Sequence, residues 1–236
     1  MPILVLQNER VSPAGIIGER IGARGHAMSV LHPMQGEPLP TSANRYAGIL
    51  VLGGVMSAND DDKYAALEPM RQLLRDFHAA DKPILGICLG AQVLARTFGG
   101  SVRRHTGMEF GYVPLRFTDA GRRDPLLSGL SNPQWIMESH EDTFDVPADG
   151  VTLMTGDDCL NQAFRVGRAA YGFQCHFEAT PTLIDSWVAG FGQTVRKSLG
   201  DRADATFARL AEDNTARAKA QRAFAEAVSD RWLDLL

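Results

Sequence analysis

Short apolar runs alternate with amphipathic stretches through the first hundred residues of the chain. The runs at 3–6, 28–31, 48–52 and 84–87 have the length and composition of buried strands. Apolar positions at helical spacing predict three helices, over 15–24, 64–80 and 89–98. The second helix has one apolar face, made of Leu67, Met70, Leu73, Leu74 and Phe77. Because helices separate the strands, right-handed crossovers and a mainly parallel sheet are expected.

After residue 100 the pattern changes to short strands between Asp, Gly and Pro turns. The predicted strands are 112–117, 134–137, 151–155, 162–165 and 169–174. They predict an antiparallel or mixed extension of the same sheet. The tail 201–236 is rich in Ala, Arg and Glu with apolar residues at loosely helical spacing. We expect a C-terminal helical extension there, packed on the body or contributing to a homodimer contact.

The composition is that of a single α/β domain over residues 1–236. Of 236 residues, 44% are hydrophobic and 22% charged, which suffices for a substantial core. The formal charge of −4 gives no basic footprint for nucleic acid, and no apolar run approaches the roughly 20 residues of a membrane helix. Three cysteines without metal-type spacing fit a reducing compartment. We therefore expect a cytoplasmic protein with no nucleic-acid or membrane partner, no metal and no cofactor.

The apolar run at 83–92 contains Cys88 between two nearby glycines, Gly86 and Gly90, at the point where strand gives way to helix. A thiol at a helix start meets unsatisfied backbone N–H groups and the positive end of the helix dipole, and both stabilise a thiolate. A buried structural cysteine is the competing interpretation. From this run alone the two interpretations are equally supported.

A second pattern, at 171–178, bears on that choice. A strand-like run ends in His176, with Glu178 two positions further on. Residues two apart in an extended segment point the same way, so Glu178 could reach one imidazole nitrogen while the other faces a thiol. A thiolate nucleophile needs a base, and the base needs an orienting group. Cys88, His176 and Glu178 together make a candidate catalytic set.

Six motifs, in order, resemble the class I (triad) glutamine amidotransferases, close to the free-standing proteins that resemble the glutaminase half of GMP synthase. The motifs lie at 53–60, 86–92, 107–112, 139–144, 161–165 and 176–178. The resemblance covers residues 1–190. It implies a three-layer, doubly wound, flavodoxin-like α/β fold with a mainly parallel sheet and an antiparallel extension. Relatives usually have prolines where this chain has Val55 and Phe177, and often an aromatic residue where it has Cys175; we interpret Cys175 as a small buried hydrophobe.

The resemblance also implies roles for residues around Cys88. An oxyanion formed by attack of Cys88 would be met by the backbone N–H groups of Leu89 and Gly54. Four further residues are expected to bind substrate: Gly53, Gln92, Ser139 and His140, the last mainly through its backbone. A stretch of glycines at 15–22 matches neither nucleotide-binding pattern and is better explained by close helix packing.

The function implied is hydrolysis of the glutamine side-chain amide through a γ-glutamyl thioester. With no ATP-type loop in the chain, the released ammonia would pass to a separate synthase protein. Two alternatives stay open: a free-standing hydrolase of γ-glutamyl peptides or conjugates, and a catalytically silent binding module. A fourth class, the chaperone and protease relatives of this fold, would carry its acidic partner upstream, and the downstream Glu178 disfavours it.

Overall fold

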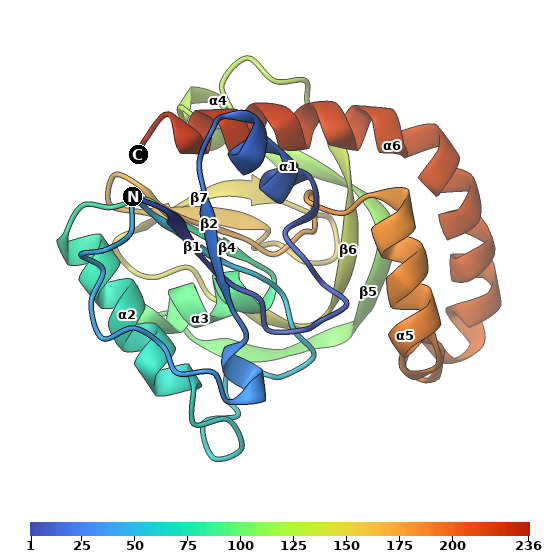
Figure 1. The fold of residues 1–236 in the computed structure, drawn as a ribbon. Helices are drawn as coiled ribbons and strands as arrows, with labels where there is room; N and C mark the ends of the chain where they lie inside the picture. The colour runs from blue at the N-terminus through green and yellow to red at the C-terminus, as the bar shows by residue number, and fades with distance from the viewer.

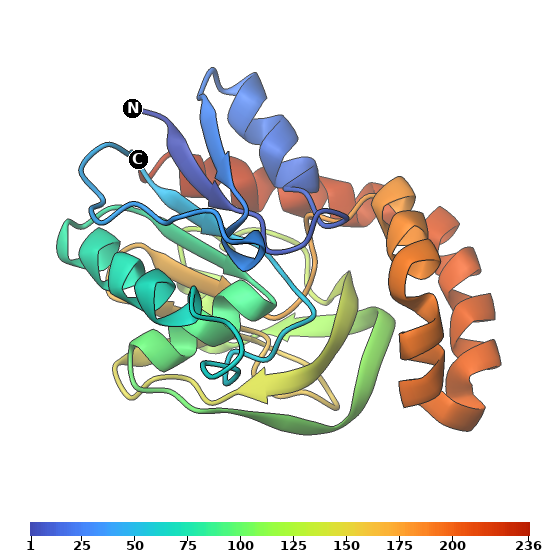
Figure 2. The ribbon, with the colours of Figure 1, turned by 60° about the horizontal axis from the view of Figure 1, so that its bottom comes forward.

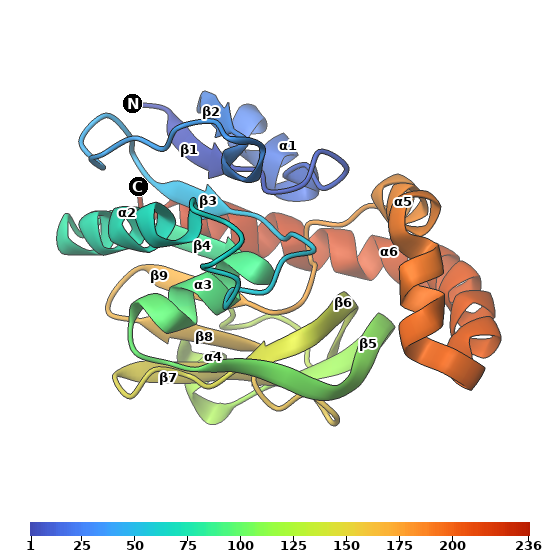
Figure 3. The same ribbon diagram turned by 90° about the horizontal axis from the view of Figure 1, so that it is seen from below.

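The computed structural model describes residues 1–236, which form one nine-stranded sheet flanked by helices (Figure 1). The strand order is β2-β1-β3-β4-β9-β8-β7-β5-β6. The first five strands in that order pair in parallel: β2 (Met28–Leu31), β1 (Ile3–Leu6), β3 (Ile49–Val51), β4 (Ile84–Ile87) and β9 (Ala170–Phe173). The remaining four are antiparallel: β8 (Ala163–Val166), β7 (Gly150–Thr155), β5 (Val102–Phe117) and β6 (Gln134–Phe144). Figure 3 shows the strands edge-on in this order from β2 to β7, while β5 and β6 curl toward α5.

Helices cover both faces of the parallel half. The helices of the whole chain are α1 (Gly15–Ala23), α2 (Leu67–Ala79), α3 (Leu89–Thr97), α4 (Asp119–Arg123), α5 (Pro181–Leu199) and α6 (Ala203–Leu233), with 3-10 turns at Pro33–Gln35 and Gly200–Arg202. Helices α1 and α6 lie on one face and α2 and α3 on the other, while α5 stands to one side beyond β5 and β6 (Figures 2 and 3). None of these helices combines the length and apolar character needed to cross a membrane.

The alternation of side chains along each parallel strand produces two separate cores. In β1, Ile3 and Val5 pack with α1 and α6, while Leu4 and Leu6 pack with α2 and α3. All four side chains are buried, because successive residues of a strand point to opposite faces and both faces are covered. This explains the continuous apolar runs in the sequence.

The predicted fold class is confirmed: the sheet is doubly wound in three layers, with an antiparallel extension at one edge. Two of the predicted strands are much longer than expected. β5 begins at Val102 and β6 continues to Phe144, in stretches rich in charged and polar residues that hide the strand pattern. A register shift between Arg104 and Glu109 further breaks the alternation.

Helix α5 was absent from the predicted elements although its start carries clear signals. The Thr180 hydroxyl accepts a hydrogen bond from the Leu183 backbone N–H, and Pro181 occupies the first helical position. After a 3-10 turn, the tail forms one helix, α6, which crosses the α1 side of the molecule (Figure 1). The structure thereby places α5 immediately after Glu178.

Candidate active site

Three neighbouring parallel strands, β3, β4 and β9, end at the same edge of the sheet. Val51 pairs with Gly86, and Ile87 pairs with Phe173, so the residues that follow each strand emerge side by side. Gly53 and Gly54 follow β3, Cys88 follows β4, and the segment 174–178 follows β9. In open α/β sheets, ligands bind outside the carboxyl ends of the strands.

Cys88 sits on a sharp turn between β4 and α3. Its φ of 50° and ψ of −107° are unusual for a residue with a side chain, and it occupies the N-cap of α3. The backbone N–H of Cys88 donates to the Phe173 carbonyl at 2.7 Å, and its carbonyl accepts from the Gln92 N–H at 3.0 Å. Strain of this kind, held by hydrogen bonds on both sides, is typical of a nucleophile presented at the top of an α/β sheet.

The glycines beside Cys88 are required by close backbone packing. A Cβ on Gly86 would lie 2.6 Å from the Gly90 carbonyl carbon, and a Cβ on Gly90 would overlap the Val51 carbonyl oxygen. Any side chain at either position would push α3 away from β3 and β4. The two glycines therefore fix where the first turn of α3 lies.

His176 and Glu178 lie in a turn rather than in a strand, because β9 ends at Phe173. The His176 Nδ1 is 2.8 Å from Glu178 Oε1, and both side chains are buried. The Trp187 ring meets the imidazole edge-to-face with a centroid distance of 4.8 Å. Glu178 and Trp187 together hold the ring in one orientation.

The charge environment favours a protonated His176. Burial lowers the pKa of this imidazole, but the Glu178 carboxylate and the Cys88 sulfur outweigh that effect and raise the pKa well above its usual range. Cys88 and His176 are close neighbours: a Cβ on Gly53 would lie 3.6 Å from the Cys88 Cβ and 3.1 Å from the His176 Cε1. The arrangement can hold an imidazolium beside a thiolate.

The predicted oxyanion donors lie next to this pair. Leu89 is the first residue of α3, directly after Cys88, where backbone N–H groups have no partner within the helix. A Cβ on Gly54 would lie 2.9 Å from the Leu89 Cδ2, so these two segments touch. Gly53 and Gly54 line the cavity above Cys88. The position of Leu89 and Gly54 beside Cys88 is suited to an oxyanion site. That their backbone N–H groups stabilise an oxyanion stays a prediction.

Gln174 was missed by the sequence analysis and contacts Cys88 directly. Its Nε2 donates to the Cys88 Sγ at 3.6 Å. Its Oε1 accepts from the Nε2 of Gln92, which also donates to the Asp142 carbonyl. Gln92 is buried and lines the cavity. The one feature of the sequence that points to Gln174 is its position two residues before His176.

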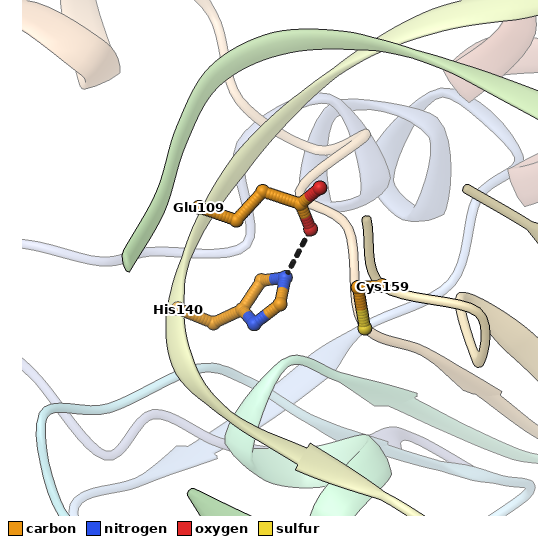
Figure 4. Close-up of side chains that lie close together, drawn as sticks. All are labelled: Glu109, His140 and Cys159. Carbon is orange, nitrogen blue, oxygen red and sulfur yellow. Dashed lines mark hydrogen bonds and ion pairs between the residues drawn. The ribbon is translucent and has the colours of Figure 1, made fainter. Parts of the chain in front are cut away.

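Ser139 and His140 approach the site from β6. The Ser139 carbonyl lies 3.9 Å from the Cys88 Sγ. The His140 side chain turns away into a buried polar cluster with Glu109, which it contacts at 2.8 Å through Nε2 (Figure 4). Its Nδ1 is 3.0 Å from the Asp142 carbonyl, so both ring nitrogens face acceptors. Burial lowers the His140 pKa, but Glu109 and Glu138 outweigh it and raise that pKa well above its usual range.

Two further groups complete the cluster around His140. Gln162 Nε2 donates to the same Glu109 oxygen at 3.0 Å. Glu138 is fully buried with its Oε2 3.3 Å from the His140 Nε2. Burial raises the pKa of Glu138 to about 7, opposed by His140. Glu109, His140 and Cys159 carry the donor types of a zinc site within 4.8 Å of one another, but hydrogen bonds already account for Glu109 and His140.

A cavity of about 420 Å³ opens above Cys88 and His176. One side is charged and polar, formed by the loop after Gly54 and the ends of β5 and β6. The other side is formed by helix α5, by Met108 and by the turn before α1. The contribution of α5 went unpredicted, because that helix itself was not expected.

The residues that replace the family prolines differ in their surroundings. Phe177 is fully buried and packs edge-to-face on Phe173 and Phe224, so the core fixes the turn between His176 and Glu178. Val55 is 69% exposed at the cavity rim. Cys175 is fully buried, and burial raises its thiol pKa well above the usual range.

Residues 16–189 match the family model described as glutamine amidotransferase class-I, and the chain belongs to that family. The glutamine amidotransferase-like protein YfeJ of Salmonella typhimurium is 26% identical over 86% of each chain. A GMP synthase [glutamine-hydrolyzing] of Porphyromonas gingivalis is 33% identical over 59% of this chain, which corresponds to 26% of that protein.

Solved structures have the same fold. A glutamine amido transferase from Methylobacillus flagellatus matches with a TM-score of 0.91 and 27% identity over 100% of this chain and 95% of that one. A glutamine amidotransferase from Thermotoga maritima matches with a TM-score of 0.85 at 23% identity, over 99% and 98% of the two chains. The predicted family resemblance is confirmed.

Proposed function

We propose that this protein hydrolyses the side-chain amide of glutamine, with Cys88 as nucleophile, His176 as acid and base, and Glu178 as the group that orients His176. The observation that carries the proposal is the buried His176–Glu178 pair beside a cysteine held at positive φ on a strand-to-helix turn. Membership of the glutamine amidotransferase class-I family, and relatives named for glutamine hydrolysis, support it.

The proposed reaction has two halves. The Cys88 thiolate attacks the γ-carbonyl carbon, and the backbone N–H groups of Leu89 and Gly54 stabilise the oxyanion. The C–N bond breaks as the His176 imidazolium gives its proton to the departing ammonia, which leaves a γ-glutamyl thioester. A water molecule then attacks the thioester, His176 takes its proton, and glutamate leaves as the thiolate re-forms.

We infer that Gln92, Ser139 and Gly53 contact the substrate, and that His140 contributes through its backbone. Gln92 and Ser139 line the cavity beside Cys88. The His140 side chain is held in its own buried cluster, away from the sulfur. We further propose that the ammonia passes to a separate synthase protein. A relative in Methanosarcina mazei, whose name describes one subunit of a glutamine-hydrolyzing GMP synthase, supports this by analogy.

Release of glutamate and ammonia from glutamine tests the proposed function. Wild-type protein and Cys159→Ala, which removes another buried thiol outside the cavity, should both turn over glutamine. Cys88→Ala and His176→Ala should each lose at least 10³-fold in kcat. Equal rates for wild type and Cys88→Ala, or no release by wild type with cell extract present, would refute the proposal.

A further inference from the structure

The cavity above Cys88 and His176 has two chemically different ends. At the polar end lie Lys63 and Arg104, with acidic partners: Arg104 pairs with Glu141 at 2.7 Å, and Lys63 with Asp60 at 2.7 Å. Both signs of charge are thus present. This end is complementary to the α-ammonium and α-carboxylate groups of a γ-glutamyl head.

The other end is a stripe on α5, whose residues in the cavity wall are Trp187, Phe191, Thr194, Val195 and Ser198. Trp187, Phe191 and Val195 are its apolar members, and Thr194 and Ser198 are polar. Their spacing places them on a single helix face. At 1.5 Å per residue its apolar part, from Trp187 to Val195, extends about 12 Å along the helix axis. Three bonds span only about 3.8 Å in a peptide chain, so the short carbon chain of glutamine leaves most of the stripe uncovered.

The stripe lies on the side where the leaving amine departs. His176 must reach the amide nitrogen to protonate it, so the nitrogen lies on the His176 side of the γ-carbon. Trp187 packs edge-to-face on His176, and Phe191 follows Trp187 at a centroid distance of 6.2 Å. Any group attached to that nitrogen is therefore directed along α5.

Apart from His176, the charged residue that lines this end is Glu9. Glu9 and Ser12 form a turn that lines the cavity, and Trp187 Nε1 donates to the Val11 carbonyl of the same turn at 3.1 Å. Lys63 and Arg104 belong to the polar end. An amine that carries its own carboxylate would meet the Glu9 carboxylate, and the one cation beside it is the His176 imidazolium, which gives its proton to the amine nitrogen.

We propose that the stripe is a leaving-group subsite for γ-glutamyl amides of apolar amines that carry no carboxylate. This proposal rests on the proposed function, because it uses the same thioester chemistry. Cys88 displaces R–NH₂ in place of ammonia, the His176 proton goes to the amine nitrogen, and water then releases glutamate. One γ-glutamyl amide and one water give one glutamate and one amine.

Three substrates test the subsite: glutamine, γ-glutamylphenethylamide and γ-glutamylphenylalanine. The last two differ only by the carboxylate on the amine. We expect kcat/KM for the phenethylamide to exceed that of each of the others at least tenfold, as a filled apolar pocket provides. In Phe191→Ser, the preference for the phenethylamide over glutamine should fall about tenfold. Gln193→Ala, exposed on α5 and outside the cavity, should keep the wild-type preference.

The outcomes separate the two proposals. Glutamine hydrolysed as fast as the phenethylamide, or a preference that survives Phe191→Ser, overturns the subsite and leaves the proposed function standing. Equal rates for the phenethylamide and γ-glutamylphenylalanine overturn the exclusion of carboxylates. No glutamate from any of the three, with no adduct on Cys88, overturns the proposed function and the subsite with it.

Discussion

At the scale of single residues, Gln174 connects the candidate nucleophile to the rest of the site. It donates to the Cys88 sulfur and accepts from Gln92, and all three side chains are buried. A hydrogen bond to a charged group contributes about 1.5–3 kcal/mol. We therefore predict that Gln174 stabilises the proposed thiolate of Cys88 and orients Gln92.

Replacement of Gln174 by Leu removes this donor at nearly constant volume. We expect kcat/KM to fall about 10- to 100-fold, and the alkylation of Cys88 by iodoacetamide at pH 7 to slow by a similar factor. Gln162→Leu, which alters another buried glutamine out of contact with Cys88, is the matched control. If both variants alkylate at the wild-type rate, Gln174 has only a structural role.

Glu138 makes folding stability depend on pH near neutrality. Its pKa of about 7 in the folded protein lies above its ordinary value of 4.5. The folded state therefore binds the proton more tightly, and stability present below pH 4.5 is lost as pH rises through 7. The shift corresponds to about 3 kcal/mol. His140, whose pKa is also raised, contributes in the same direction.

Glu138→Gln should abolish most of that loss. Urea unfolding at pH 5 and pH 8 measures it: wild type should lose about 2.5 kcal/mol more than the variant between the two pH values. The remaining His140–Glu109 pair is common to both proteins. If the unfolding free energies of wild type and Glu138→Gln change equally between the two pH values, Glu138 is ionised at neutral pH in the folded state, contrary to this prediction.

How far the sequence predicts the site depends on how local each signal is. Cys88 could be found because its glycines are within two residues, and Glu178 because it is two residues from His176. The cluster of Glu109 with His140 and Gln162 joins three separate strand regions. No spacing of these residues in the sequence predicts that they are in contact. Gln174 was close to His176, but its contact with Cys88 depends on pairing between β4 and β9.

At the scale of elements, the contact of α3 with β3 sets the position of Cys88. A Cβ on Gly90 would overlap the Val51 carbonyl, whereas a Cβ on Gly190, within α5, would meet nothing within 4 Å. Both glycines are in helices, so replacement by alanine should destabilise the fold at Gly90 and stabilise it at Gly190.

Gly90→Ala should destabilise the fold by at least about 3 kcal/mol, because backbone must shift to relieve the overlap. Gly190→Ala should instead stabilise it by up to about 1 kcal/mol, through helix propensity. Thermal unfolding of the two variants beside wild type gives the comparison. A Gly90→Ala protein as stable as wild type would contradict this close packing of α3 on β3.

Element prediction succeeded where both faces of a strand are buried and failed where one is not. The apolar runs of β1 and β4 read directly as strands. The first half of β5 carries Arg103, Arg104 and other polar residues, and its bulge breaks the alternation. Helix α5 had an N-cap threonine and a first-turn proline, and its apolar residues pack partly in a buried cluster and partly along the cavity.

At the scale of the whole molecule, a residue of α6 holds two segments of the candidate site together by hydrogen bonds. Gln221, buried in α6, accepts from the Met137 N–H at 2.8 Å and donates to the Ala179 carbonyl at 2.7 Å. The His176 N–H in turn donates to the Met137 carbonyl at 2.8 Å. One side chain thus ties β6 to the turn that carries His176 and Glu178.

Gln221→Leu leaves a buried N–H and a buried carbonyl without partners. Each unsatisfied group costs about 1–3 kcal/mol, so we expect a loss of about 2–6 kcal/mol and a marked fall in Tm. Gln193→Leu, at an exposed position on α5, should change Tm little. A Gln221→Leu protein that unfolds with the wild-type midpoint would show that α6 does not brace this turn. Contacts between residues 84 positions apart, such as Gln221 with Met137, lie beyond any local sequence pattern.

The central claim is that Cys88 forms a γ-glutamyl thioester, and rapid quenching of wild-type protein with glutamine, followed by peptide mass mapping, tests it most directly. We predict a γ-glutamyl adduct on the peptide that contains Cys88 and none on Cys159 or Cys175. The adduct should accumulate further in variants whose thioester hydrolysis is slowed. Glutamine turnover without any adduct on Cys88, or an adduct on another residue, would contradict it.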